Sequence, residues 1–281
     1  MREIVDSGEL KRIELDILKD VSAFCEAHGI RCYLGYGTLL GAARHRGFIP
    51  WDDDVDVLMP RPDYERFCRE YGGDRFSVHT FRNDPGFFYP FAKVYDDRTL
   101  VVEDRDPNGR SAVCVDVFPV DGLSDADAHP RRVLRGQRRC YAALSLRRAP
   151  PLLRRRSWRK QLALWIGAPL RLIPSVVRGG LARRALRRFD RTVSAVGFDS
   201  ALFAGVMVWG YGSREALPRS VFDPGEALPF EDGRFPAMRG WREYLAGLYG
   251  DYMTPPPPDR RITHHDFRAW WKEGEPKDDP A

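Results

Sequence analysis

Apolar residues recur every three or four positions between Leu10 and Phe24, the spacing that places side chains on one face of an α-helix. Gly29 follows, and glycine commonly ends a helix because it adopts left-handed backbone angles without a Cβ clash. The pattern therefore predicts an amphipathic helix that ends near Gly29. A second helix is expected to start at Pro60–Asp63, and its inner side comprises Tyr64, Phe67, Cys68 and Tyr71.

Short apolar runs bounded by turn-forming residues predict strands along the first half of the chain. They cover residues 30–34, 54–58, 76–81, 91–95, 99–102 and 112–119. Residues 227–237 predict a hairpin around Asp232-Gly233, and a helix with Trp241, Tyr244, Leu245 and Leu248 on one face follows it. These elements indicate an α/β fold with a mixed sheet.

Acidic residues gather directly before one of these strands. Four aspartates occupy five positions: Asp52, Asp53, Asp54 and Asp56. Asp54 and Asp56 alternate with valines, so a strand places both carboxylates on one face. Two carboxylates this close repel each other unless a cation lies between them, and hard oxygen ligands suit Mg²⁺ or Mn²⁺. For Asp52 and Asp53 a solvated loop is the alternative.

Two further features extend this candidate site. Asp116 lies in an alternating strand pattern, where a buried carboxylate is costly unless a cation or hydrogen-bond donors accompany it. It is therefore the third candidate metal ligand, and an edge-strand position facing solvent is the alternative. Gly37 and Thr38 stand where a short helix is expected to begin, so backbone N–H groups there can hold phosphate oxygens.

The string GTLLGAARHRGFIPWDDDVDVLMPR (37–61) closely resembles the signature of the LicD family, the phosphocholine transferases related to the fukutin-type ribitol-phosphate transferases. Two later blocks, FAKVYDDRT (91–99) and VDVFPVDG (115–122), match the family pattern as well. The motif YGDYMTPPPPDRRITHH (249–265) resembles the closing motif of the family. The resemblance is specific, because it fixes residue types at many spacings.

This resemblance implies a nucleotidyltransferase-type fold and a CDP-linked donor. It further implies that a phosphocholine-like or alditol-phosphate-like group passes to a hydroxyl of a glycan or lipid-linked saccharide, and that CMP leaves. Asp54, Asp56 and Asp116 are the predicted catalytic residues and ligands of Mg²⁺ or Mn²⁺, and Asp116 is also a candidate proton acceptor. The predicted donor-binding residues are Gly37, Thr38, Arg44, His45, Lys93, Arg261, His264 and His265. At most one histidine of the adjacent pair is expected to touch the donor.

The charge of the 281-residue chain is distributed unevenly. Its net charge is +5, but residues 131–191 contain 19 basic residues and one acid and carry +18, so the remainder carries −13. We expect a catalytic core over 1–124, a basic helical insert over 125–196 and a C-terminal part of the core over 197–281 that closes over the site. The insert fits either peripheral contact with an anionic membrane or a helical hairpin of the core, and a nucleic-acid partner is disfavoured.

Five cysteines form no CxxC pair, which argues against a disulfide framework and a zinc site. The first twenty residues lack the apolar core of a signal peptide. Both features predict a cytoplasmic protein, with peripheral association at the inner membrane face as a possibility left open by the insert. Two other functions stay open: a nucleotidyltransferase that releases pyrophosphate, and a non-catalytic protein that binds membranes or polyanions.

Overall fold

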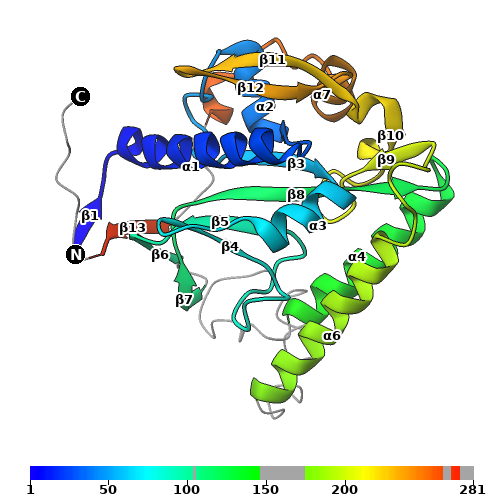
Figure 1. The fold of residues 1–281 in the computed structure, drawn as a ribbon, viewed down its shortest axis with the longest axis horizontal. Coiled ribbons are helices and arrows are strands. Elements are labelled where there is room, and N and C mark those ends of the chain that lie inside the picture. Colours follow the sequence, from blue (N-terminus) through cyan, green and yellow to red (C-terminus); the bar gives the residue numbers. More distant parts are fainter. Residues whose placement is uncertain (104–105, 146–174, 262–266, 273–281) are drawn as a thin grey trace.

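The computed structural model describes residues 1–103, 106–145, 175–261 and 267–272 (Figure 1). The helices are α1 (Ser7–His28), α2 (Tyr36–Arg44), α3 (Arg61–Glu70), α4 (Ala128–Ser145), α6 (Ser175–Val193) and α7 (Trp241–Tyr249). The strands are β1 (Arg2–Ile4), β2 (Tyr33–Leu34), β3 (Asp56–Pro60), β4 (Phe76–His79), β5 (Ala92–Asp96), β6 (Thr99–Glu103), β7 (Asp106–Ser111), β8 (Cys114–Leu123), β9 (Phe203–Gly205), β10 (Leu217–Pro218), β11 (Pro224–Phe230), β12 (Gly233–Met238) and β13 (Phe267–Trp271). The predicted α/β class with a mixed sheet is confirmed.

A seven-stranded sheet forms the centre of the molecule. Its strands run in the order β10-β9-β8-β3-β2, and β5 pairs with both β8 and β4. β3 and β8 are parallel, whereas the other pairs in this sheet are antiparallel. Helix α1 crosses one face of the sheet in Figure 1, and α2, α7 and the β11–β12 hairpin lie beyond it. Parallel pairing of β3 and β8 sets their N-terminal ends side by side.

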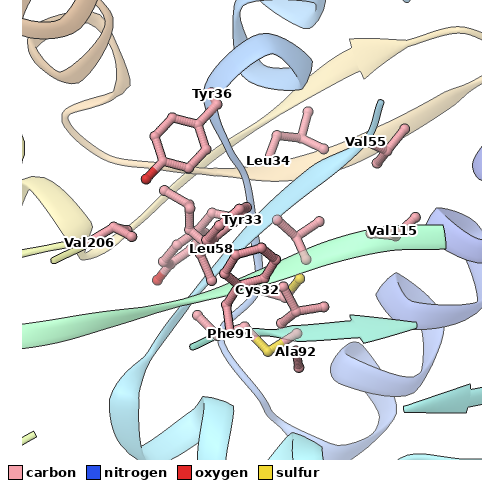
Figure 2. Close-up of a cluster of buried hydrophobic side chains, with 14 of the residues drawn as sticks. Cys32, Tyr33, Leu34, Tyr36, Val55, Leu58, Phe91, Ala92, Val115 and Val206 are labelled. Carbon is pink, nitrogen blue, oxygen red and sulfur yellow. The ribbon is translucent and has the colours of Figure 1, made fainter. Parts of the chain in front are cut away.

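The core consists of apolar side chains from these strands and from the helices on them. Figure 2 shows Leu58, Ala92 and Val115 from three neighbouring strands in one cluster with Tyr33 and Leu34. Leu34, Leu58 and Val115 are fully or almost fully buried. Removing such side chains from water supplies most of the favourable free energy of folding. The core therefore fixes β3 and β8, which carry the candidate metal ligands.

Local patterns predicted several helices and one hairpin correctly. Helix α1 ends at Gly29, which has a left-handed φ of 61°. The predicted hairpin is β11–β12, whose closing pair is Phe230 and Gly233. Helix α7 follows it and buries Trp241, Tyr244, Leu245 and Leu248 as predicted. All five cysteines are free, also as predicted.

Other boundaries differ from the predictions. The strand predicted over 54–58 begins at Asp56 and ends at Pro60, so Asp54 lies in the preceding loop. The strand predicted over 30–34 contains only Tyr33 and Leu34. A second sheet, in the order β1-β13-β6-β7, joins both ends of the described chain and was not predicted. Strand β13 pairs with β1 and β6 across long sequence separations, which local patterns do not encode.

Two long helices, α4 and α6, represent the described part of the predicted basic insert. They pack side by side and project from one corner of the molecule (Figure 1). Buried Arg61 joins their base to the core, since its guanidinium contacts Asp121 of β8 at 2.6 Å and Asp190 of α6 at 3.2 Å. No helix in the described ranges is long and apolar enough to span a bilayer. The predicted division at residues 124 and 196 stays a prediction.

Candidate active site

Three charged side chains form a row across neighbouring strands. Asp56 of β3 stands opposite Asp116 of β8, which in turn stands opposite Lys93 of β5. The Lys93 ammonium lies 2.5 Å from Oδ1 of Asp116. Burial opposes the charged form of this lysine, but the Asp116 carboxylate outweighs it and raises the pKa of Lys93 well above its ordinary value. Strand register thus brings together two predicted metal ligands and one predicted phosphate contact.

Asp56 lies in an environment that disfavours its negative charge. The residue is only 8% exposed. Burial first, and then the charges of Asp54, Asp116 and Asp52, raise the pKa of Asp56 well above its ordinary value. The four carboxylates are therefore close enough to repel one another, which is the condition under which a bound cation stabilises a site.

The start of α2 packs directly against this acidic loop. The Oγ1 atom of buried Thr38 accepts a hydrogen bond from the backbone N–H of Asp56 at 2.8 Å, so Thr38 positions the first residue of β3. A Cβ atom on Gly37 would lie 2.5 Å from Oδ2 of Asp52 and 3.9 Å from Oδ1 of Asp54. A side chain at this position would force the carboxylate of Asp52 to move. The predicted contacts of Gly37 and Thr38 with phosphate stay predictions.

A cavity of about 430 Å³ opens beside these residues. Four aspartates line the cavity: Asp52, Asp54 and Asp56, which we call its acidic wall, and Asp251. Six aromatic side chains, which we call its aromatic wall, also line it: Tyr36, Trp51, Trp209, Tyr211, Tyr249 and Tyr252. Gly37 and Arg44 also line the cavity. Its volume lies within the range of small-molecule sites, and its lining offers both ring faces and carboxylate oxygens.

The other predicted donor-binding residues differ in how close they lie to this cavity. Arg44 donates a hydrogen bond to the carbonyl of Tyr252 at 2.8 Å, and its Nε lies 3.4 Å from Nδ1 of His45. Burial, together with Arg44, lowers the pKa of His45, so its neutral form is favoured. Arg261 lies over the ring of Trp51 at 5.2 Å, at the rim of the cavity. His264 and His265 lie outside the described residues.

A buried carboxyl group accepts a hydrogen bond from Tyr36 of the aromatic wall. Glu215 is fully buried and its Oε2 accepts hydrogen bonds from the hydroxyls of Tyr36 at 2.7 Å and Tyr244 at 3.5 Å. Among the residues that the structure describes, its Oε1 is buried without a hydrogen-bond partner. Burial raises the pKa of Glu215 to about 8, although the two tyrosine hydroxyls act in the opposite direction. Tyr36 opens α2 with a positive φ of 39°, so this contact holds an uncommon backbone angle in place.

The chemistry of the acidic wall fits a hard divalent cation, because its donors are carboxylate oxygens that repel one another. Within the described ranges, no three His, Cys, Asp or Glu side chains already converge closely enough to enclose an ion. In this arrangement Lys93 supplies the positive charge next to Asp116. Asp54, Asp56 and Asp116 could hold Mg²⁺ only after their side chains move toward it.

Sequence reasoning missed several residues of this region. The aromatic wall includes Tyr249 and Tyr252, which lie in a motif quoted above but were not singled out. The sequence did not decide whether Asp52 belongs to a solvated loop or to the candidate site, and the structure shows that it lines the cavity. Glu14 of α1 is buried, and burial together with Asp54 and Asp53 raises its pKa well above the ordinary value. Glu215 carries no sequence signal, since only the tertiary structure buries it. Glu14 does carry one, because it lies four residues after Leu10 and three before Ile17, on the apolar face of α1.

The parallel pair β3–β8 with aligned carboxylates, next to a glycine-containing helix start, defines a nucleotidyltransferase-type domain. Residues 29–132 match the family model "LicD/FKTN/FKRP, nucleotidyltransferase domain". The chain is 28% identical over 273 residues to the lipopolysaccharide cholinephosphotransferase LicD of Haemophilus influenzae, a match that covers 93% of this chain and 97% of that protein. A shorter match, 62% identical over 32 residues, links it to the ribitol 5-phosphate transferase FKRP of Homo sapiens and covers 11% of this chain and 6% of that protein.

Residues 29–132 are therefore a domain of the LicD family, and the chain is an enzyme of the transferase class. The family model includes β3, β8 and the whole aspartate run, so the carboxylates described above lie within the matched domain. The resemblance noted from the sequence is confirmed.

Proposed function

We propose that this enzyme transfers phosphocholine, or a closely related substituted phosphate, from a CDP-linked donor to a hydroxyl of a glycan or lipid-linked saccharide. The observation that carries the proposal is a cavity lined by four aspartates and six aromatic side chains. Ring faces attract a quaternary ammonium through cation–π interactions, an attraction that an uncharged alditol lacks. The similarity to a cholinephosphotransferase over nearly the whole chain supports the same choice.

Mg²⁺ or Mn²⁺ held by Asp54, Asp56 and Asp116 would neutralise the two phosphates of the donor and the charge that develops on the leaving group. In the transfer, the acceptor hydroxyl oxygen bonds to the distal phosphorus. The bond from that phosphorus to the bridging oxygen breaks, and CMP leaves with the bridging oxygen. In this proposal Asp116 accepts the hydroxyl proton, and Lys93, which contacts Asp116, stabilises negative charge beside it.

Further chain residues would orient the donor. The backbone at Gly37 lies at the start of α2, where unpaired N–H groups favour phosphate oxygens. Arg44 and Arg261 provide positive charge at the cavity and its rim. The aromatic side chains exclude water from the reacting phosphates, which strengthens every charge interaction within the cavity. We place this reaction on the cytoplasmic side of the inner membrane.

Product analysis tests the proposed function directly. The enzyme is incubated with CDP-choline, Mg²⁺ and a lipopolysaccharide acceptor, and the nucleotide products are separated by chromatography. We expect release of CMP that depends on the acceptor and on Mg²⁺, together with choline on the glycan. Release of pyrophosphate from CTP, with no CMP from CDP-choline, would instead identify a nucleotidyltransferase.

A further inference from the structure

The exposed faces of α4 and α6 are both strongly basic. The two helices contain five and six arginines, but their only acidic residue is Asp190. Asp190 is buried at the base of the pair, where it contacts Arg61 and Arg82, so it does not neutralise the exposed faces. Nine arginines of the pair are exposed: Arg131, Arg132, Arg135, Arg138, Arg139, Arg184, Arg187, Arg188 and Arg191.

Apolar side chains continue the basic face of α6 at its N-terminal end. Val177 and Leu181 are 49% and 43% exposed. They precede Arg184, Arg188 and Arg191 at alternating steps of four and three residues, so all five lie on one face of the helix. The opposite face is apolar and buried, since Leu186 and its neighbours pack into the molecule. The exposed stripe of α6 thus combines two apolar residues with three cations.

The helix pair is attached directly to the cavity wall. Nε2 of Gln137 in α4 donates hydrogen bonds to the carbonyls of Met207 at 3.1 Å and Trp209 at 2.6 Å. The hydroxyl of Tyr141, one turn later, donates to the carbonyl of Val208 at 2.9 Å. Trp209 lines the cavity. The position of α4 and α6 is therefore fixed relative to the site.

We propose that the exposed stripe of α6, formed by Val177, Leu181, Arg184, Arg188 and Arg191, docks on a membrane of anionic phospholipids. Guanidinium groups pair well with lipid phosphates, and each basic residue near such a surface adds to the attraction. Exposed valine and leucine side chains gain by entering the boundary between headgroups and acyl chains. A nucleic acid backbone would also bind the arginines, but it has no apolar region into which Val177 and Leu181 could insert.

Docking through this face goes beyond the proposed reaction, because it needs neither donor nor metal. If the acceptor is a lipid-linked saccharide, as the proposed function allows, docking would also hold the cavity at the surface that carries the acceptor. The rigid contacts of Gln137 and Tyr141 with residues 207–209 would transmit this orientation. Membrane binding and donor binding are separable measurements.

Vesicle co-sedimentation of the full chain tests the proposal. Vesicles of phosphatidylcholine alone are compared with vesicles of equal parts phosphatidylcholine and phosphatidylglycerol. The double variant Arg184→Glu/Arg188→Glu alters the proposed surface. Its matched control is Arg12→Glu/Arg69→Glu, which changes the net charge equally at two exposed arginines of α1 and α3. Circular dichroism and calorimetric binding of CDP verify that both variants fold and keep the donor site.

We expect binding to the anionic vesicles only, and binding about thirty-fold weaker in the α6 variant than in the control. A further variant, Val177→Ser/Leu181→Ser, should bind more weakly at every salt concentration without a change in salt dependence, since it removes no charge. Equal binding by the α6 variant and its control would overturn the proposal. Absence of vesicle binding together with tight binding of duplex RNA would overturn it too and assign the surface to nucleic acid.

Discussion

Replacing Glu215 by glutamine should change how the stability of this enzyme depends on pH. The carboxyl group is fully buried behind the aromatic wall of the cavity, and burial raises its pKa from the ordinary 4.5 to about 8. In the unfolded chain the group ionises near the ordinary value. Between the two pKa values the folded protein therefore holds one more proton than the unfolded chain, so stability falls as the pH rises.

The size of this effect follows from the gap between the two pKa values. One pH unit of difference corresponds to about 1.4 kcal/mol, so the whole gap corresponds to about 5 kcal/mol. The loss of folding stability due to Glu215 is absent below pH 4.5, grows between pH 4.5 and about 8, and is constant above that. Glutamine has nearly the same shape and can still accept the hydrogen bond from Tyr36, but it cannot ionise. Glu215→Gln should remove the dependence without opening a cavity.

Urea unfolding at a series of pH values between 5 and 9 directly measures how the free energy of unfolding depends on pH. The free energy of unfolding of the wild type, minus that of Glu215→Gln, should decrease by about 4 kcal/mol between pH 5 and pH 8. Glu243→Gln, at an exposed position of α7, serves as the matched control and should run parallel to the wild type. If the wild type and Glu215→Gln ran parallel as well, Glu215 would ionise normally in the folded protein and the reasoning would be refuted.

Three further substitutions test other parts of the structure. Arg61→Ala should lower the free energy of unfolding by about 4 kcal/mol in urea, because it leaves Asp121 buried without its guanidinium partner, whereas exposed Arg66→Ala should cost less than about 1 kcal/mol. Equal losses would contradict the role of the buried pair. Asp56→Asn should abolish turnover in the CMP-release assay without lowering the urea midpoint, since it relieves carboxylate repulsion; near-native turnover would refute the site. Gly37→Ala should weaken CDP binding in calorimetry at least ten-fold, because its methyl group meets a carboxylate oxygen, and unchanged affinity would disprove the close packing.

The sequence predicted those elements whose signals are local. Helix α1 follows from apolar spacing and a terminal glycine, and β11–β12 follows from alternation around a two-residue turn. The strand pattern around Asp116 likewise predicted one apolar face and one face with the carboxylate, and Val115 and Val117 are fully buried. In these segments the local backbone preference agrees with the burial in the fold, so the short-range pattern is sufficient to predict the element.

Contacts set by strand register or tertiary burial could not be read from the sequence. Asp56, Asp116 and Lys93 align because β5, β3 and β8 are neighbours, although β4 and β6 are nearer to β5 in sequence. Glu215 follows Gly212-Ser213-Arg214, a polar sequence typical of a surface turn, yet it is fully buried. The burial of Glu215 depends on residues that are distant in sequence, so no local spacing predicts it.

The most direct test of the central claim is a calorimetric titration of the wild type and Asp56→Asn with CDP-choline, CDP, UDP and GDP, each with and without Mg²⁺. The claim is that the acidic wall of the cavity holds a CDP-linked donor through a divalent cation. It predicts that the wild type binds CDP-choline and CDP in preference to UDP and GDP, and only when Mg²⁺ is present. It also predicts that Asp56→Asn loses this binding. Equal affinity with and without Mg²⁺, or equal affinity in Asp56→Asn, would contradict the claim.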